Sequence, residues 1–312
     1  MDTIAKNQRI ITKFSQDTYL LSWMNGFLLD RKAQNMSKGT LVFYQKKLKL
    51  FTDYCSAQVI TQITEITPQI IRLYLLYLEE KGHNPGGVNA AYRTLRTFLY
   101  WWEQEVEPDG WSNPIRKAKP PKVSLELLEP VSLEDISIII DTCEKTFNGH
   151  RDRAILLGLL DTGSRASEFL GMKLDDLNLV TGEIIIRQGK GGKFRTVFLG
   201  KTSRRSVRAY LKNRTDISNA LWVSQNGEEL TYWGLREIIR RRSIKANIKP
   251  PSLHSFRRAF AINMLRAGVD VFSLQKLMGY ADLQVLRRYL DQTIEDIAQA
   301  HRIGSPVDNN RL

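Results

Sequence analysis

Residues 113–122 read NPIRKAKPPK, and this stretch determines how the rest of the chain is interpreted. It holds three prolines and four cationic side chains. A proline removes a backbone donor and fixes φ, so neither a helix interior nor a central strand accommodates such a run. We therefore predict an extended linker at residues 113–123 with a domain on either side. The length of 312 residues fits two domains of about 150 residues each.

On the N-terminal side of the linker, residues 15–112 are predicted to be helical. Thr67 and Pro68 fit the N-cap and first position of one helix, and another helix follows Pro85. Two further apolar stripes complete a four-helix domain, and residues 1–14 are expected to be a flexible N-terminus. Apolar side chains at the helical spacing of three and four residues include Leu20, Trp23, Phe27, Leu48, Phe51, Tyr74, Leu78, Leu95, Phe98 and Trp102.

On the C-terminal side, residues 124–302 mix several helices with a small antiparallel β-sheet. Glu183–Gln188 and Phe194–Leu199 are β-rich and flank a glycine-rich turn, so they predict a hairpin. Leu221–Ser224 is expected to be a further short strand, and residues 303–312 a C-terminal tail. The predicted fold class is therefore mainly α. Helices are expected at Ser132–Cys143, Arg151–Leu160, Arg165–Met172, Thr231–Ala246, His254–Ala267, Val271–Met278, Leu283–Leu290 and Ile294–His301.

Charge and composition restrict the class of partner. The net charge is +13, and both parts contribute: residues 1–120 carry 16 basic and 11 acidic side chains, and residues 121–312 carry 30 and 22. A polyanion that contacts both domains is therefore expected. No apolar run approaches the roughly 20 residues of a membrane span, and no secretory signal is present. The two cysteines form no CxxC pair, so we expect a reduced, cytoplasmic protein.

Common cofactor motifs are absent from the sequence. The four histidines show no metal-ligand spacing, and there is no GxxxxGK[ST] phosphate loop. We therefore expect an activity that needs neither a metal ion nor ATP.

Three short patterns combine into one interpretation. They are TGSRASE at residues 162–168, LHSFR at residues 253–257, and LMGYAD at residues 277–282 followed by RRY at 287–289. Together with the hairpin lysine, their order resembles the tyrosine recombinase (phage integrase) family, especially its simple Xer-like members, over about residues 15–302. The residues that match the family pattern are Arg165, Glu168, Lys190, His254, Arg257 and Tyr289.

The resemblance implies a helical core-binding domain followed by a catalytic domain, and a chemistry that suits these residues. Arg165 and Arg257 would clamp the non-bridging oxygens of a DNA phosphate and neutralise the charge of the transition state. Tyr289 would attack the phosphorus and form a 3′-phosphotyrosine. Lys190 would protonate the leaving 5′-oxygen. His254 would accept the tyrosine proton or bond a phosphate oxygen, and Glu168 would orient Arg165 or His254.

Tyr280 departs from the family pattern, in which His or Trp follows the glycine. A phenol can donate a hydrogen bond and offer a flat packing face, but it cannot carry a positive charge. We include Tyr280 among the catalytic candidates as a hydrogen-bond donor to the phosphate. Packing alone, or attack by Tyr280 itself, are the alternatives.

Basic helices are the candidate DNA contacts. Arg236 and Arg240 share one face of the helix predicted at Thr231–Ala246, which is long enough to enter a major groove. Arg93 and Arg96 lie on the last helix of the first domain and could hold the other side of the duplex. An ordinary solvated basic face is the alternative in each case.

The expected function is site-specific DNA recombination on a double-stranded target site in the cytoplasm, at the nucleoid. The resemblance implies four protomers on two duplexes, with Ile294, Ile297 and Ala298 as apolar contacts on a neighbour, and it leaves room for an accessory DNA-bending protein or a partner recombinase. Three alternatives stay open: a type IB topoisomerase, which acts as a monomer without site preference, a catalytically silent DNA-binding protein of the same fold, and a basic regulator unrelated to cleavage.

Overall fold

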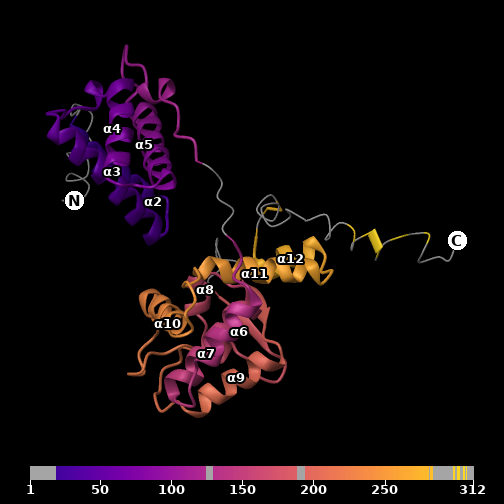
Figure 1. Cartoon of the computed structure of the whole chain (residues 1–312). Helices are drawn as coiled ribbons and strands as arrows, with labels where there is room; N and C mark the ends of the chain where they lie inside the picture. The colour runs from indigo at the N-terminus through magenta and orange to yellow at the C-terminus, as the bar shows by residue number, and fades with distance from the viewer. Residues whose placement is uncertain are drawn as a thin grey trace. The chain divides into compact units, whose positions relative to one another are not determined.

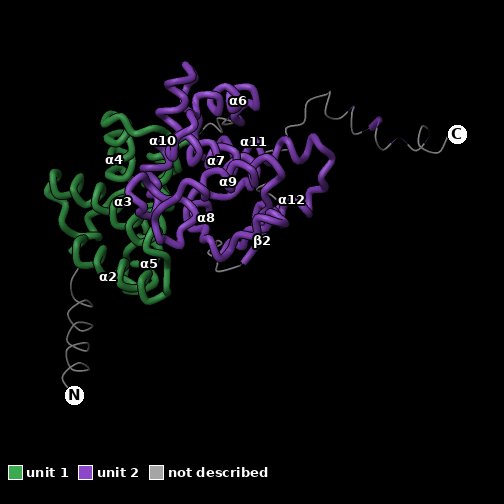
Figure 2. The backbone as a smooth tube through the Cα atoms, turned by 90° about the horizontal axis from the view of Figure 1, so that it is seen from below, with its two compact units in different colours: residues 1–126 green, residues 127–312 purple. Residues whose placement is uncertain are grey.

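The structure is a computed structural model in which the chain forms two compact units, residues 1–126 and 127–312 (Figure 2). Among the residues that the structure describes, no helix is both long and apolar enough to cross a membrane. The described residues are 19–123, 129–187, 194–280, 282–283, 298, 301–302, 305 and 307. The helices predicted at Leu283–Leu290 and Ile294–His301 lie largely outside them, as do the predicted N-terminal segment 1–14 and most of the tail 303–312.

The first unit is a helical domain built on an aromatic core. Its helices are α2 (Leu20–Ala33), α3 (Lys38–Ala57), α4 (Pro68–Glu80) and α5 (Pro85–Val106) (Figure 1). The Trp23 ring meets the rings of Trp101 and Trp102 edge to face, at 6.0 and 6.3 Å between centroids. Thr67 caps α4 as predicted, because its hydroxyl accepts the N–H of Ile70 and Pro68 occupies the first turn. The largest fully buried side chains here are Phe27, Phe51, Tyr74, Phe98 and Trp102.

The segment predicted as an extended linker is partly folded, which corrects that prediction. Pro114–Lys117 forms a 3₁₀ helix, and Ile115 and Ala118 are buried in the core of the first unit. The hydroxyl of Tyr92 donates to the carbonyl of Ala118 at 2.7 Å. Pro114 suits the first position of this turn, because the N–H at that position would have no partner within the helix and proline lacks that N–H. The first unit therefore includes residues that the proline content assigned to a linker.

The second unit is organised around α7 (Phe147–Thr162), which packs against α6 (Leu133–Asp141), α9 (Lys201–Lys212) and α11 (Leu253–Arg266) (Figure 1). Ser132 caps α6 as predicted, since its hydroxyl accepts the N–H of Asp135 at 2.9 Å. The remaining helices are α8 (Ala166–Leu170), a 3₁₀ turn (Leu174–Asp176), α10 (Tyr232–Lys245) and α12 (Val271–Met278).

The sheet consists of two antiparallel strands, β1 (Glu183–Ile186) and β2 (Arg195–Phe198), with Ile186 opposite Arg195. The hairpin prediction is therefore confirmed. The strand expected at Leu221–Ser224 is wrong: within the described chain, Val223 forms only an isolated bridge with Glu229. Helix α9 was not predicted, because charged residues mask a stripe of Ser203, Ser206, Val207 and Tyr210 that is buried.

Candidate functional site

The turn between α7 and α8 places the first arginine. Gly163 ends α7 with a φ of 54°, and a Cβ on it would lie 2.3 Å from the ring of Phe260, so the position requires glycine. Arg165 is the N-cap of α8, and its backbone N–H donates to the Glu168 carboxylate at 2.9 Å. The Arg165 side chain donates to the other carboxylate oxygen at 2.8 Å. The predicted pairing of Glu168 with Arg165 is present.

Glu168 is a buried carboxylate between two arginines. Its side chain is 2% exposed, and it bonds Arg165 through Oε1 and Arg195 through Oε2, the latter at 2.7 Å. Burial raises the pKa of this carboxyl, but the N–H of Arg165 and the two guanidiniums outweigh burial, so the pKa lies below its ordinary value. Glu168 is therefore an anion that holds two cations in place.

Arg257 lies on the first turns of α11 and is 2% exposed. Its Nη1 donates to the carbonyl of Gly163 and its Nη2 to the carbonyl of Met278, both at 2.6 Å, while Nε donates to the Tyr280 hydroxyl at 3.1 Å. These contacts use three of the five N–H groups of a guanidinium, so two can serve a ligand. Burial lowers the pKa of Arg257 from its ordinary value.

Tyr280 lies between the two predicted phosphate-binding arginines. Its ring centroid is 4.6 Å from the guanidinium carbon of Arg257 and 5.4 Å from that of Arg165. Arg165 also donates to the carbonyl of Gly279 at 3.4 Å. The residue that departs from the family pattern therefore contacts both arginines, through its ring and, toward Arg257, through its hydroxyl.

His254 lies at the start of α11, one turn before Arg257, as the His-x-x-Arg pattern predicts. Burial lowers the pKa of its imidazole, and the positive charges of Arg257, Arg258 and Arg165 lower it further. A neutral imidazole can accept a proton, which suits the role predicted for His254.

A cavity of about 580 Å³ connects His254 to the basic face of α10. Arg236 and Arg240 both line it, so they share a face as predicted. Trp233 is 72% exposed, and the guanidinium of Arg236 lies 5.3 Å from its ring centroid. Arg240 is held by Glu237 through two hydrogen bonds of 2.8 Å.

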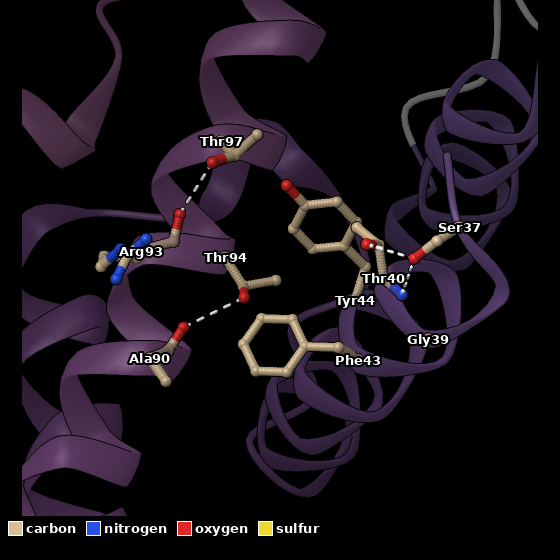
Figure 3. A pocket seen from close by; sticks show the side chains of 9 residues that line it. All are labelled: Ser37, Gly39, Thr40, Phe43, Tyr44, Ala90, Arg93, Thr94 and Thr97. Atoms are coloured by element: carbon tan, nitrogen blue, oxygen red, sulfur yellow. Dashed lines mark hydrogen bonds between the residues drawn. The ribbon is translucent and has the colours of Figure 1, made fainter. Parts of the chain in front are cut away.

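In the first unit, Arg93 lines a cavity of about 490 Å³ between α3 and α5 (Figure 3). Phe43 and Tyr44 of α3 face Thr94 of α5 across it (Figure 3). Arg96 is exposed, with its guanidinium 5.6 Å from the centroid of Tyr100. The guanidinium of Arg116 lies 5.8 Å from the same centroid. Arg116, which was predicted to lie in the linker, therefore contacts the same ring of the first unit as Arg96 does.

Lys190 and Tyr289, the predicted general acid and nucleophile, lie outside the described residues. The described site thus contains Arg165, Glu168, His254, Arg257 and Tyr280, from α8, α11 and the end of α12.

Arg195 is a residue of the site that was not predicted, although its place in the strand carries a signal. It shares a strand face with Val197, which is buried, because alternate residues of a strand point to the same side. A cation on the buried face of a strand needs a partner, and here that partner is Glu168.

Comparison with known proteins agrees with the fold and identifies the family. The profile of the phage integrase family matches residues 131–295, and that of the phage integrase N-terminal SAM-like domain matches residues 26–106. The chain belongs to the phage integrase (tyrosine recombinase) family of site-specific recombinases.

Two curated relatives are Xer recombinases. The chain is 28% identical to tyrosine recombinase XerD of Staphylococcus haemolyticus over 281 residues, which is 88% of this chain and 94% of XerD. It is 30% identical to tyrosine recombinase XerA of Thermococcus kodakarensis over 75% of this chain and 81% of XerA.

Solved structures share the fold at lower identity. The XerH recombinase in its post-cleavage complex with the difH substrate matches with a TM-score of 0.69 and 20% identity, over 96% of this chain and 88% of XerH. A lambda integrase dimer bound to a core site matches with a TM-score of 0.71 and 16% identity, over 86% and 97% of the two chains.

Proposed function

We propose that this recombinase cuts and rejoins DNA through a 3′-phosphotyrosine formed on Tyr289. The observation that carries the proposal is the convergence of Arg165 and Arg257 on Tyr280, with the buried anion Glu168 behind Arg165. Two guanidiniums beside one position form a binding site for a dianionic, phosphorane-like state.

The proposed step balances in bonds and protons. The phenolic oxygen of Tyr289 bonds to phosphorus, and the bond from phosphorus to the 5′-oxygen breaks. His254 takes the phenolic proton, and Lys190 gives a proton to the leaving 5′-oxygen. Because the phosphotyrosine keeps the energy of the phosphodiester, attack by a 5′-hydroxyl reverses the step and rejoins the strand.

The distribution of charge supports binding of duplex DNA by both units. Arg236 and Arg240 line a cavity that continues to His254, and Arg93 and Arg96 are exposed on α5. We propose that α10 contacts the duplex near the cleavage site and that α5 contacts its backbone. The protein would act in the cytoplasm on nucleoid DNA.

Recombination of two duplexes requires several protomers, and we propose a tetramer on two target sites. The solved lambda integrase complex is a dimer on a core site, and XerH was solved on its difH substrate. A partner recombinase or a DNA-bending protein would be an additional component.

The test is a single-turnover reaction with a nicked duplex that carries the target site, since the nick lets the cleaved fragment diffuse away. Wild type should accumulate a covalent protein–DNA adduct, and Tyr289→Phe should bind DNA with similar affinity and form none. An adduct of normal yield in Tyr289→Phe would exclude Tyr289 as nucleophile. Supercoil relaxation without site preference would favour the topoisomerase alternative, and lack of an adduct with wild type would favour the silent DNA-binding protein.

A further inference from the structure

Arg195 connects the β-hairpin to the arginine site. It is the first residue of β2 and follows directly on the segment 188–194, which includes Lys190. Its side chain is 9% exposed. An arginine with so little exposure needs specific acceptors for its charge, because an unpaired buried cation is strongly unfavourable. Its two Nη atoms have such acceptors, whereas its buried Nε has none among the described residues.

The acceptors of Arg195 belong to two different parts of the site. Its Nη2 bonds the Glu168 carboxylate at 2.7 Å, and its Nη1 donates to the carbonyl of Leu277 in the last turn of α12. The side chain also fits closely over Gly279, where an added Cβ would lie 2.7 Å from both Cδ and Nε of Arg195. Gly279 has a φ of 63°, so two independent features require glycine there.

Both contacts lead directly to residues of the proposed phosphate site. Glu168 holds the guanidinium of Arg165, and Leu277 to Gly279 is the segment whose continuation is Tyr280. Arg165 in turn donates to the carbonyl of Gly279. Arg195 therefore closes a ring of contacts that runs through Glu168, Arg165 and Gly279.

We infer that Arg195 is a positioning residue for cleavage, which sets the places of Arg165 and Tyr280 through Glu168 and the Leu277 carbonyl. This inference rests on the proposed function, in which those two residues contact the scissile phosphate. A displacement of about 1 Å in such a site can cost on the order of a hundredfold in rate.

The shape of the side chain matters as well as its charge. A guanidinium reaches two acceptors at once through its fork, whereas an ammonium is a compact point charge. Arg195→Lys should therefore keep one of the two contacts and cleave at an intermediate rate. Arg195→Met, which keeps length but no charge, should cleave about tenfold to a hundredfold more slowly than wild type.

The decisive experiment varies the charge of the scissile phosphate. Single-turnover cleavage is measured on a normal phosphodiester and on a methylphosphonate at the same position, which has one oxygen replaced by a neutral methyl group. A residue that acts through Arg165 should matter less on the neutral substrate, because less charge then needs to be neutralised. The loss in Arg195→Met should shrink on the methylphosphonate, in parallel with the loss in Arg165→Ala.

A control and a double-mutant cycle complete the experiment. Arg187 lies beyond the end of β1 in the same hairpin and pairs with Asp176 at 2.6 Å, with its side chain 62% exposed. Arg187→Met removes a hairpin arginine of similar type outside the site and should leave cleavage unchanged. In combination with Glu168→Gln, Arg195→Met should cost less than the product of the two single losses, because both act on Arg165.

Several results would overturn the inference. An equal loss of Arg195→Met on both substrates, or multiplicative losses with Glu168→Gln, would reduce Arg195 to support of the fold. If Arg195→Met does not fold, the same comparison with Arg195→Lys decides, since that variant keeps the charge. No adduct with wild type on the phosphodiester would refute the proposed function itself and this inference with it, whereas an active wild type with substrate-independent Arg195 losses refutes only the inference.

Discussion

Replacing Tyr280 by phenylalanine removes one oxygen from the centre of the site and keeps the aromatic ring. The hydroxyl accepts the Nε–H of Arg257 at 3.1 Å, and this contact disappears. The ring remains over both guanidiniums, at 4.6 and 5.4 Å from its centroid. The substitution therefore separates the role of the phenol from that of the aromatic face.

The expected size follows from the kind of bond that is lost. A hydrogen bond with a charged partner contributes about 1.5–3 kcal/mol, and about 1.4 kcal/mol corresponds to a factor of ten. Because Arg257 is 2% exposed, its Nε–H has no ready replacement by bulk water. We expect Tyr280→Phe to cleave roughly ten- to a hundredfold more slowly. Tyr280→Leu also loses two cation–π contacts, each worth about 0.5–2 kcal/mol, and should be slower still.

The assay is the formation of covalent adduct on nicked DNA at saturating protein, with binding measured separately. Tyr280→His is the matched variant and should be tolerated, because a neutral imidazole offers an acceptor nitrogen for the Nε–H of Arg257 as well as an N–H donor. Tyr280→Phe at the full rate, with Tyr280→Leu slow, would refute the hydrogen-bond argument and leave only packing. Peptide mapping of the adduct tests the remaining alternative, since DNA attached to Tyr280 would transfer the role of nucleophile from Tyr289.

The other predictions concern the arginines, the histidine and salt. Arg165→Ala and Arg257→Ala should each slow cleavage on the order of 10²–10³-fold. Arg257→Ala should also lower the denaturation midpoint more than Arg165→Ala does, because Arg257 is the more buried. If both variants cleave within twofold of wild type, the two arginines do not clamp the phosphate. Because its pKa is lowered, His254 should stay neutral at pH 7 and protonate only below the ordinary value of about 6.5. An NMR titration checks this, with His254→Gln used to assign the imidazole signal. A pKa of 6.5 or above would contradict the prediction. The affinity for DNA should fall steeply with salt. The double variant Arg93→Ala, Arg96→Ala should reduce the slope of log affinity against log salt concentration by about 0.9 for each phosphate contact removed. An unchanged slope would show that α5 does not touch DNA, and Arg187→Ala is the control.

Local signals in the sequence were sufficient for most of the helices. Thr67 and Ser132 cap α4 and α6 as predicted, because a hydroxyl acceptor three residues before a donor N–H is a purely local arrangement. Helix α9 escaped prediction, since the polar Ser203 and Ser206 are buried by tertiary contacts that no local pattern contains. The prediction for the proline-rich segment was wrong for the same reason, because the burial of Ile115 depends on tertiary contacts with the core of the first unit.

The site was predicted as a set of residue types, and its connections were not. Arg165 and Glu168 lie three residues apart at the start of α8, and His254 and Arg257 lie three residues apart in α11. Each pair could be predicted from its spacing alone. The contacts of Tyr280 with Arg165 and Arg257 join segments more than twenty residues apart, and Arg195 reaches Glu168 from 27 residues away. Such contacts follow from the tertiary fold. The order of the motifs along the chain therefore indicated which residues form the site, but not which of them contact one another.

The acceptors that hold the arginines have a consequence for how this protein can diverge. Arg257 is bonded by the carbonyls of Gly163 and Met278, Arg165 by that of Gly279, and Arg195 by that of Leu277. Every amino acid offers a backbone carbonyl, so the acceptor survives a change of side chain wherever the backbone path is kept. Of the four residues that supply these carbonyls, we therefore expect side-chain changes to be tolerated at Leu277 and Met278 but not at the two glycines, whose φ values fix the backbone path. A library randomised at Leu277 and Met278 should yield many active apolar variants, whereas one at Gly163 and Gly279 should return almost only glycine.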